Sequence, residues 1–249
     1  MRGANAGTGR IEQDKDSRAS CEEATVTTKD KAAPRSYGQA CPLATAMDLL
    51  GERWTLLVVR ELLLGPKKFG ELGVRLAAAG PNRLSSRLDR LREAGAIEKT
   101  AAGAYTLTDF GEGLRQPVIG LAMWGLGLMQ GGVDALEPRP DVIALVLTTL
   151  VSADALDGLD VTCQVQSGDD FVIDVHDGRM TVVSGRTDDP DCAHLMCSTA
   201  TFIQLVSDST TLDSAIAHGD AQIADETGDV HTLMTVLGTT VADIRAIST

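Results

Sequence analysis

Residues 81–108, PNRLSSRLDRLREAGAIEKTAAGAYTLT, decide the fold of the first half of the chain. Three leucines recur there at spacings of four and three, which places them on one face of a helix. They are Leu84, Leu88 and Leu91. Pro81 suits the first helical position and Gly95 a C-terminal cap, so the pattern predicts one amphipathic helix between them.

The face of this helix opposite the leucines carries Asn82, Arg83, Ser86 and Arg90. Asn, Arg and Ser are residue types that hydrogen-bond base edges and phosphates. The spacing therefore predicts a DNA recognition helix. The alternative is an ordinary solvated face, which is common for a single Arg on a helix.

The elements around this helix give it a context. Two helical runs separated at Gly51 precede it within residues 42–64, and residues 67–77 predict a short helix with Phe69, Leu72 and Leu76 inward. Two short strands follow, over 97–100 and 105–108, joined by an Ala-Gly turn. Three helices followed by a hairpin predict a winged helix-turn-helix, whose recognition helix enters the major groove.

Several stretches resemble the HxlR-type winged-helix transcription regulators of bacteria, together covering residues 38–128. They are Cys41-Pro42, GERWTLLVVRELLLGPKKFGEL from 51, NRLSSRLDRLREAGAIEK from 82, YTLTDFGEGL from 105, and Trp124-Gly125. The resemblance implies a dimeric regulator that binds double-stranded DNA at a palindromic operator. The DNA-binding residues expected here are Lys67, Lys68, Asn82, Arg83, Ser86, Arg87, Arg90 and Lys99.

Two positions depart from the family pattern. Gly80 stands where the family usually carries the Ser that begins the recognition helix, so a side-chain N-cap is missing. The wing is short, Ala101–Gly103, with only Lys99 nearby. We therefore expect DNA affinity to depend mainly on Lys67, Lys68 and the arginines of the helix.

The segment from Asp109 to Gln130 predicts one helix with more apolar surface than a three-helix domain can cover. We expect it to pair with the same helix of a second subunit to form a homodimer. The predicted contacts are Leu114, Val118, Leu121, Trp124 and Leu128. The alternative is packing against the C-terminal part of the same chain.

Cys41 matches a position that serves as a thiol switch for oxidants or electrophiles in part of the HxlR family. The resemblance implies a redox-sensing role, and a place beside a helix N-terminus favours thiolate. The alternative is an inert cysteine, since buried cysteines are common.

Charge is distributed unevenly along the 249 residues, whose net charge is -13. Residues 131–249 carry 4 basic and 20 acidic side chains, whereas residues 67–99 carry 8 basic and 4 acidic ones. This asymmetry predicts two domains with different partners. The expected order is a disordered leader over 1–36, a DNA-binding and dimerisation domain over 37–132, a linker over 133–140, and a ligand-binding domain over 141–249.

The C-terminal part predicts helices and alternating strands, among them a hairpin at Asp177-Gly178, so the whole chain is of the α+β class. Its element order resembles the sterol-carrier-protein-2-like domains, which implies a cavity for a small hydrophobic ligand. The cavity residues expected here are Phe171, Ile173, Phe202, Leu205 and Ile223. Each of them is also compatible with an ordinary core.

No catalytic motif of the G-x-S-x-G or H-E-x-x-H type and no phosphate-binding glycine loop occurs, so we expect no enzyme and no cofactor. Cys192, His194 and Cys197 lack a fourth convergent ligand, which argues against zinc. Five cysteines without a framework, no signal-peptide pattern and no membrane-spanning run predict a cytoplasmic protein. The rival functions are a lipid carrier and an enzyme acting in the C-terminal cavity.

Overall fold

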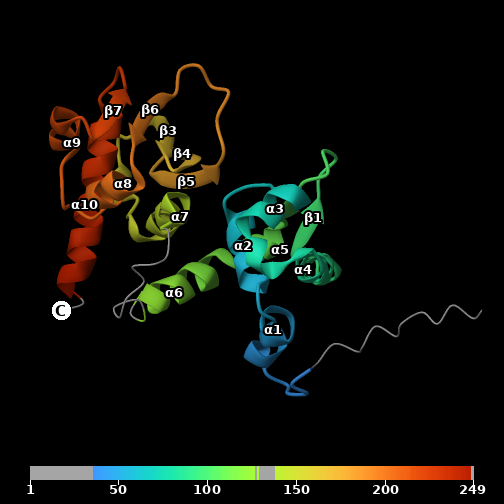
Figure 1. The fold of residues 1–249 in the computed structure, drawn as a ribbon. Coiled ribbons are helices and arrows are strands. Elements are labelled where there is room, and N and C mark those ends of the chain that lie inside the picture. The colour runs from blue at the N-terminus through green and yellow to red at the C-terminus, as the bar shows by residue number, and fades with distance from the viewer. Residues whose placement is uncertain (1–35, 127, 129–137, 248–249) are drawn as a thin grey trace, which may run out of the picture. The chain divides into compact units, whose positions relative to one another are not determined.

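The computed structural model describes residues 36–126, 128 and 138–247 (Figure 1). Its first part, the winged-helix region, is mostly helical and contains a two-stranded sheet. The elements are α1 (Pro42–Leu50), α2 (Thr55–Leu63), α3 (Phe69–Arg75), the 3-10 turn η1 (Ala77–Ala79), α4 (Pro81–Glu93), β1 (Ile97–Lys99), β2 (Tyr105–Leu107), α5 (Asp109–Glu112) and α6 (Arg115–Leu126). The predicted order of helices and hairpin is confirmed.

The predicted recognition helix is α4, and the leucine stripe fixes its orientation. The three leucines of the stripe are buried in the core of the region. At its C-terminal end Gly95 has φ +72, and the amide of Ala96 donates to the carbonyl of Leu91 at 2.9 Å. A left-handed residue closed by such a bond satisfies the last carbonyls of a helix, as the sequence predicted.

The predicted single helix from Asp109 to Gln130 is wrong in one respect. The chain forms the short helix α5, bends at Gly113, and begins α6 at Arg115. Gly111 lies so close to the carbonyl oxygen of Ala96 that an added Cβ would be 1.9 Å from it. This close approach holds α5 against the turn that follows α4, and α6 then leaves in its own direction. Phe69 also departs from expectation, since its side chain is partly exposed.

The second part, the C-terminal region, is built on a five-stranded sheet in the order β5-β4-β3-β6-β7. Its elements are α7 (Pro140–Leu150), η2 (Asp154–Leu156), β3 (Val161–Ser167), β4 (Asp169–His176), β5 (Arg179–Ser184), β6 (Ala193–Cys197), α8 (Thr199–Val206), α9 (Leu212–His218), β7 (Ala221–Ala224) and α10 (Asp229–Ile247). The β3–β6 pair is parallel and the other pairs are antiparallel. The predicted α+β class and the Asp177-Gly178 hairpin are confirmed.

One buried glutamine holds the connection between β5 and β6. These two strands run in the same direction, so the chain must pass over β4 and β3 to join them. The side chain of Gln164 accepts a hydrogen bond from the amide of Thr187 at 2.9 Å and donates to the carbonyls of Phe171 and Gly185 at 3.1 and 3.3 Å. Strand alternation alone gave no sign of this role.

The winged-helix region and the C-terminal region meet at a cluster of four charged side chains, which we call the charged junction. It consists of Glu61 on α2, Arg75 on α3, Arg139 immediately before α7, and Asp141 on α7. Both carboxylates have no exposed surface. Arg75 and Arg139 each contact both of them. Because each buried charge has opposite charges beside it, the cluster is compensated.

The arginines determine the ionisation of Glu61. Burial by itself raises the pKa of a carboxyl group, but hydrogen bonds from Arg139 and Arg75 and the charge of Arg60 outweigh this effect and lower the pKa of Glu61 to about 2. The same arginines hold the pKa of Asp141 below its ordinary value, against the effect of burial. Both acids are therefore ionised at neutral pH.

The predicted domain limits meet the described residues only in part. Residues 1–35 of the expected leader and residues 133–137 of the expected linker lie outside them. Residues Ser36–Thr249 form one compact unit by their contacts. A division of this unit into two domains stays a prediction.

We expect Glu61→Gln to lower the free energy of unfolding by about 3 kcal/mol at pH 7, because the ordinary pKa near 4.5 falls to about 2 in the folded chain. The stabilisation is complete above the ordinary pKa and is lost as the pH falls toward 2. Denaturant unfolding of both proteins between pH 7 and pH 3 measures this difference. Glu98→Gln, at an exposed position on β1, is the control. Equal destabilisation of Glu61→Gln at pH 7 and pH 3 would contradict the assignment.

Candidate nucleic-acid interface

The first turns of α4 present the polar residues that the sequence singled out. Asn82, Arg83 and Ser86 are exposed on the side away from the leucine stripe. The guanidinium of Arg83 has a single weak contact, 3.5 Å from the carbonyl oxygen of Ala79. These three side chains come from one helical surface and are available to a partner.

Arg87 and Arg90 depart from the expectation of a free outward face. Arg90 donates to the carbonyl of Asp48 in the last turn of α1 at 2.8 Å, and a nitrogen of Arg87 lies 3.2 Å from a carboxylate oxygen of Glu52. Only 14% of the Arg87 side chain and 23% of the Arg90 side chain are exposed. Both positions flank the outward face. Arg90 fastens α4 to α1, whereas Arg87 has only an ion pair with Glu52, which follows α1, and its buried Nε and Nη1 have no hydrogen-bond partner among the described residues.

The predicted DNA contact by Lys67 is wrong. Lys67 is 5% exposed, and its ammonium group donates to the carbonyls of Glu61, Leu64 and Gly65 at 2.7, 3.0 and 3.3 Å. These carbonyls end α2, where a cation completes the unsatisfied acceptors. Burial, followed by the charge of Arg75, lowers the pKa of Lys67 to about 8. Its role is structural.

The other two lysines of the predicted set are exposed. Lys68 is the residue before α3, and its amide donates to the side chain of Glu71 at 2.5 Å. Lys99 ends β1, and its ammonium nitrogen lies 5.4 Å from the ring centre of Tyr105. Tyr105 also exchanges two backbone hydrogen bonds with Lys67, which attaches the wing to the connection between α2 and α3. The wing thus holds one exposed cation, Lys99, beside strand β2, which is attached to the connection between α2 and α3.

The predicted dimerisation residues divide into two groups. Val118 is buried and Leu114 packs against the core, so these two belong to the interior of their own region. Leu121, Trp124 and Leu128 are exposed by 50%, 66% and 69%. The reason for the split is the break before α6, which turns only part of the apolar surface outward. Leu126, which the sequence analysis did not select, is also half exposed.

Cys41 is the residue before the first turn of α1, and its carbonyl accepts hydrogen bonds from the amide and hydroxyl of Thr45 at 3.0 and 3.1 Å. Its thiol is partly buried and is not in a disulfide. A redox role for Cys41 stays a prediction. In the part of the chain that the structure describes, no three His, Cys, Asp or Glu side chains converge as a metal site.

The predicted cavity residues of the C-terminal region are core residues. Phe171 and Phe202 are fully buried and meet edge to face with ring centres 5.5 Å apart, while Ile173 is fully buried beside them in the sheet and Leu205 nearly so on α8. Ile223 packs against the same core. Four of these side chains are buried in the core and Ile223 is partly buried against it, and a ligand cavity lined by them stays a prediction.

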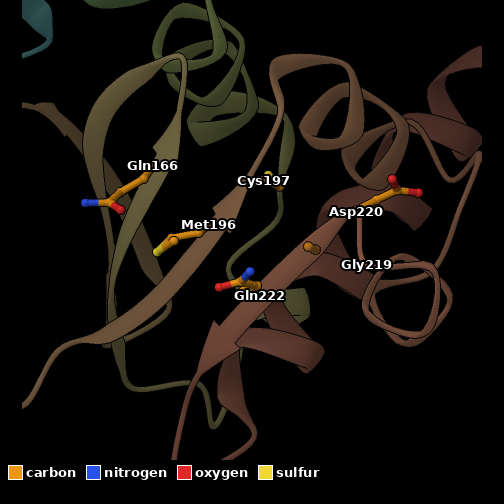
Figure 2. Close-up of a pocket in the computed structure, with 7 residues that line it drawn as sticks. Gln166, Met196, Cys197, Gly219, Asp220 and Gln222 are labelled. Carbon is orange, nitrogen blue, oxygen red and sulfur yellow. The ribbon is translucent and has the colours of Figure 1, made fainter.

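A pocket of about 310 Å³ lies elsewhere, at the ends of β3 and β6 and the start of β7 (Figure 2). It is lined by Gln166, Met196, Cys197, Gly219, Asp220, Ala221 and Gln222. Burial raises the pKa of the Cys197 thiol, which keeps it in the unreactive protonated form. None of the predicted cavity residues lines this pocket.

Among the described helices, none has the length and apolar character needed to cross a bilayer.

Comparison with known proteins identifies the family. Residues 49–131 match the HxlR-like helix-turn-helix family. The HTH-type transcriptional regulator YvaP of Bacillus subtilis, which is uncharacterized, is 32% identical over 97 residues, and the match covers 36% of this chain and 89% of YvaP. The chain belongs to the HxlR-like helix-turn-helix family. The expected resemblance of the winged-helix region is therefore confirmed.

Two further matches differ in the share of the chain that they cover. An uncharacterized HTH-type transcriptional regulator of Mycobacterium tuberculosis, Rv3095, is 36% identical over 102 residues, 39% of this chain, and the chain spans 59% of that relative's length. The solved structure of UbiJ-SCP2, a ubiquinone synthesis protein, matches 42% of this HxlR-like chain and 95% of its own, with 14% identity and a TM-score of 0.34.

We expect Arg90→Ala to lower the free energy of unfolding by about 1.5 to 3 kcal/mol, because it removes a charged donor from the end of α1. Thermal and denaturant unfolding measure this change. Arg92→Ala is the matched control, since Arg92 is half exposed and has only a 3.8 Å contact with Asp89. If both substitutions shift unfolding equally, Arg90 does not fasten α4 to α1.

Proposed function

We propose that this protein is a DNA-binding transcriptional regulator that acts as a homodimeric repressor at a two-fold symmetric operator. The observation that carries the proposal is the exposed face of α4, where Asn82, Arg83 and Ser86 project from a helix held by a buried leucine stripe. Membership of the HxlR-like helix-turn-helix family supports the same function. Occupation of an operator near a promoter is sufficient for repression.

The chemistry of α4 assigns different tasks to its two halves. The first half presents an amide, a guanidinium and a hydroxyl, which can read adenine, guanine and phosphate. The second half presents Asp89 and Glu93 together with Arg92. Carboxylates are repelled by the phosphate backbone. We therefore assign base contacts to the N-terminal half of the helix and phosphate contacts to Lys68 and Lys99.

The homodimer is supported by the apolar side chains that α6 leaves uncovered. The alternative was that the C-terminal part of the same chain covers this surface. Although α6 contacts α7, Leu121 and Trp124 remain exposed. A two-fold pairing of the same surface in a second copy buries them without a further partner.

The proposal includes no ligand cavity and no lipid carriage in the C-terminal region. The five residues predicted to line such a cavity belong to a packed core. The proposal includes no catalytic activity either, because the HxlR-like relatives bear the names of transcription regulators. The proposed site of action is the cytoplasm, where chromosomal DNA is available.

Binding to the region upstream of the protein's own gene tests the function. We expect Arg83→Ala and Asn82→Ala each to weaken operator binding by about 1 to 3 kcal/mol, if each contacts a base edge. Arg186→Ala, an exposed arginine of the C-terminal region, is the control. Footprinting should show two half-sites separated by about 34 Å or a multiple. Unchanged affinity in both α4 variants would remove this helix from the interface.

The double substitution Leu121→Glu with Trp124→Glu is expected to give monomers, because it places charges where two apolar surfaces meet. Sedimentation velocity measures the oligomeric state. Val74→Glu changes an apolar residue on α3 that is 80% exposed, and it should leave the dimer intact. A dimer that survives the double substitution would show that α6 is not the dimer contact.

A further inference from the structure

The charged junction contains an acid and an arginine from each region, a distribution that an ordinary buried interface does not need. The winged-helix region contributes one acid and one arginine, Glu61 and Arg75, whose carboxylate oxygen and guanidinium nitrogen are 2.6 Å apart. The C-terminal region also contributes one of each, Asp141 and Arg139, which are 3.0 Å apart. Every acid thus has an arginine from its own region as well as one from the other region.

The contacts between the regions use the same four groups together with Asp169 and Ser184 of the C-terminal region. Arg75 pairs with Asp141, and Arg139 lies 3.3 Å from Glu61. Asp169 on β4 supports both arginines, at 3.2 Å from Arg139 and 3.9 Å from Arg75. If the regions moved apart, the contacts across the junction would be lost, while Glu61 would keep Arg60 and Arg75, and Arg139 would keep Asp141 and Asp169.

This distribution of charges lowers the free-energy cost of separating the two regions. Removing one member of a buried ion pair is strongly unfavourable when it leaves a buried charge without compensation. Here no charge is left uncompensated, because each carboxylate keeps its own arginine and both gain water. A junction with both acids on one side and both arginines on the other would not have this property.

The main chain beside the cluster is also suited to separation. The amide of Ser184 on β5 donates to the carbonyl of Leu64 at 2.9 Å. β5 is an edge strand, so this amide becomes accessible to water when Leu64 moves away. Gly65 approaches Val183 so closely that an added Cβ would lie 2.8 Å from a methyl group of Val183, so the backbone of one region packs on a side chain of the other.

We propose that the charged junction is a separable contact, at which the winged-helix region and the C-terminal region part and rejoin while both stay folded. The protein then exists in a closed and an open arrangement. Arg75 lies on α3, so opening releases a helix that packs against α4, the candidate recognition helix. This inference concerns the internal motion of the chain and holds whether or not the protein binds DNA.

Native-state hydrogen exchange of the full chain tests the proposal, with the Ser184 amide as the reporter because its acceptor lies in the other region. We expect this amide to exchange faster than the amides of Val165 in the central strand β3. The denaturant dependence of its rate should be weaker than that of Val165, since opening exposes less surface than global unfolding. Exchange of Ser184 and Val165 at the same rate and with the same denaturant dependence would overturn the proposal.

Substitutions separate the contacts across the junction from those within a region. Arg75→Gln and Asp141→Asn should each speed exchange at Ser184 about tenfold or more while its weak denaturant dependence is kept, whereas Arg115→Gln, in an exposed pair with Glu112, should have no effect. In the double variant Arg75→Gln with Asp141→Asn, the acceleration of Ser184 exchange should be smaller than the product of the two single accelerations, because both substitutions remove the same contact.

The pair Arg139 and Asp141 is the matched control for coupling, since both lie in the C-terminal region and stay together when the junction opens. In the double variant of Arg139 and Asp141, the acceleration of Ser184 exchange should equal the product of the two single accelerations. Equal behaviour of Arg75→Gln and Arg115→Gln would refute the separable contact. If Arg75→Gln does not fold, the denaturant dependence of the natural chain still decides between the two outcomes.

Discussion

A carboxylate with no access to water, that of Glu61, is the constraint around which the structure is organised. An ion in that position is tolerated only if cations surround it, and arginines from α3 and from the segment before α7 supply them. The same stretch of α2 ends in carbonyls that Lys67 satisfies, and Lys67 in turn pairs with the wing strand β2. Contacts with the end of α2 therefore fix the positions of α3, the wing and α7.

This organisation explains why the basic character of residues 67–99 is divided. Lys67, Arg75, Arg87 and Arg90 are engaged by acceptors of the same chain. The positive charge left for a polyanion comes mainly from Lys68, Arg83, Arg92 and Lys99. A count of basic residues therefore overstates the charge available to DNA, and the placement of α4 has more influence on binding than the local excess of cations.

Local patterns could be predicted from the sequence, and contacts between distant segments could not. The leucine stripe, the Gly95 cap and the Asp177-Gly178 turn depend on neighbours a few residues away, so their spacing was enough. The partners of Glu61 include Arg139, which is distant in sequence, and no periodicity connects them.

The same limit explains the errors at the candidate interface. The exposure of Leu121 and the burial of Val118 depend on the direction in which α6 leaves α5, which is set by the contact of Gly111 with Ala96. The residues expected around a cavity were identified correctly as apolar and inward. Whether inward residues leave a space depends on side-chain packing, and Phe171 and Phe202, which meet edge to face, have no exposed surface.

The beginning of α4 has one more consequence. Gly80 offers no side chain, so no side-chain acceptor caps the first turn of the helix. An external oxyanion is the natural acceptor for such amides. In the proposed complex with DNA, every nucleotide would offer the same phosphate to this turn, which would add to affinity for any duplex and leave discrimination among sequences to the side chains of Asn82 and Arg83. In that complex, Gly80 would favour non-specific binding over selectivity.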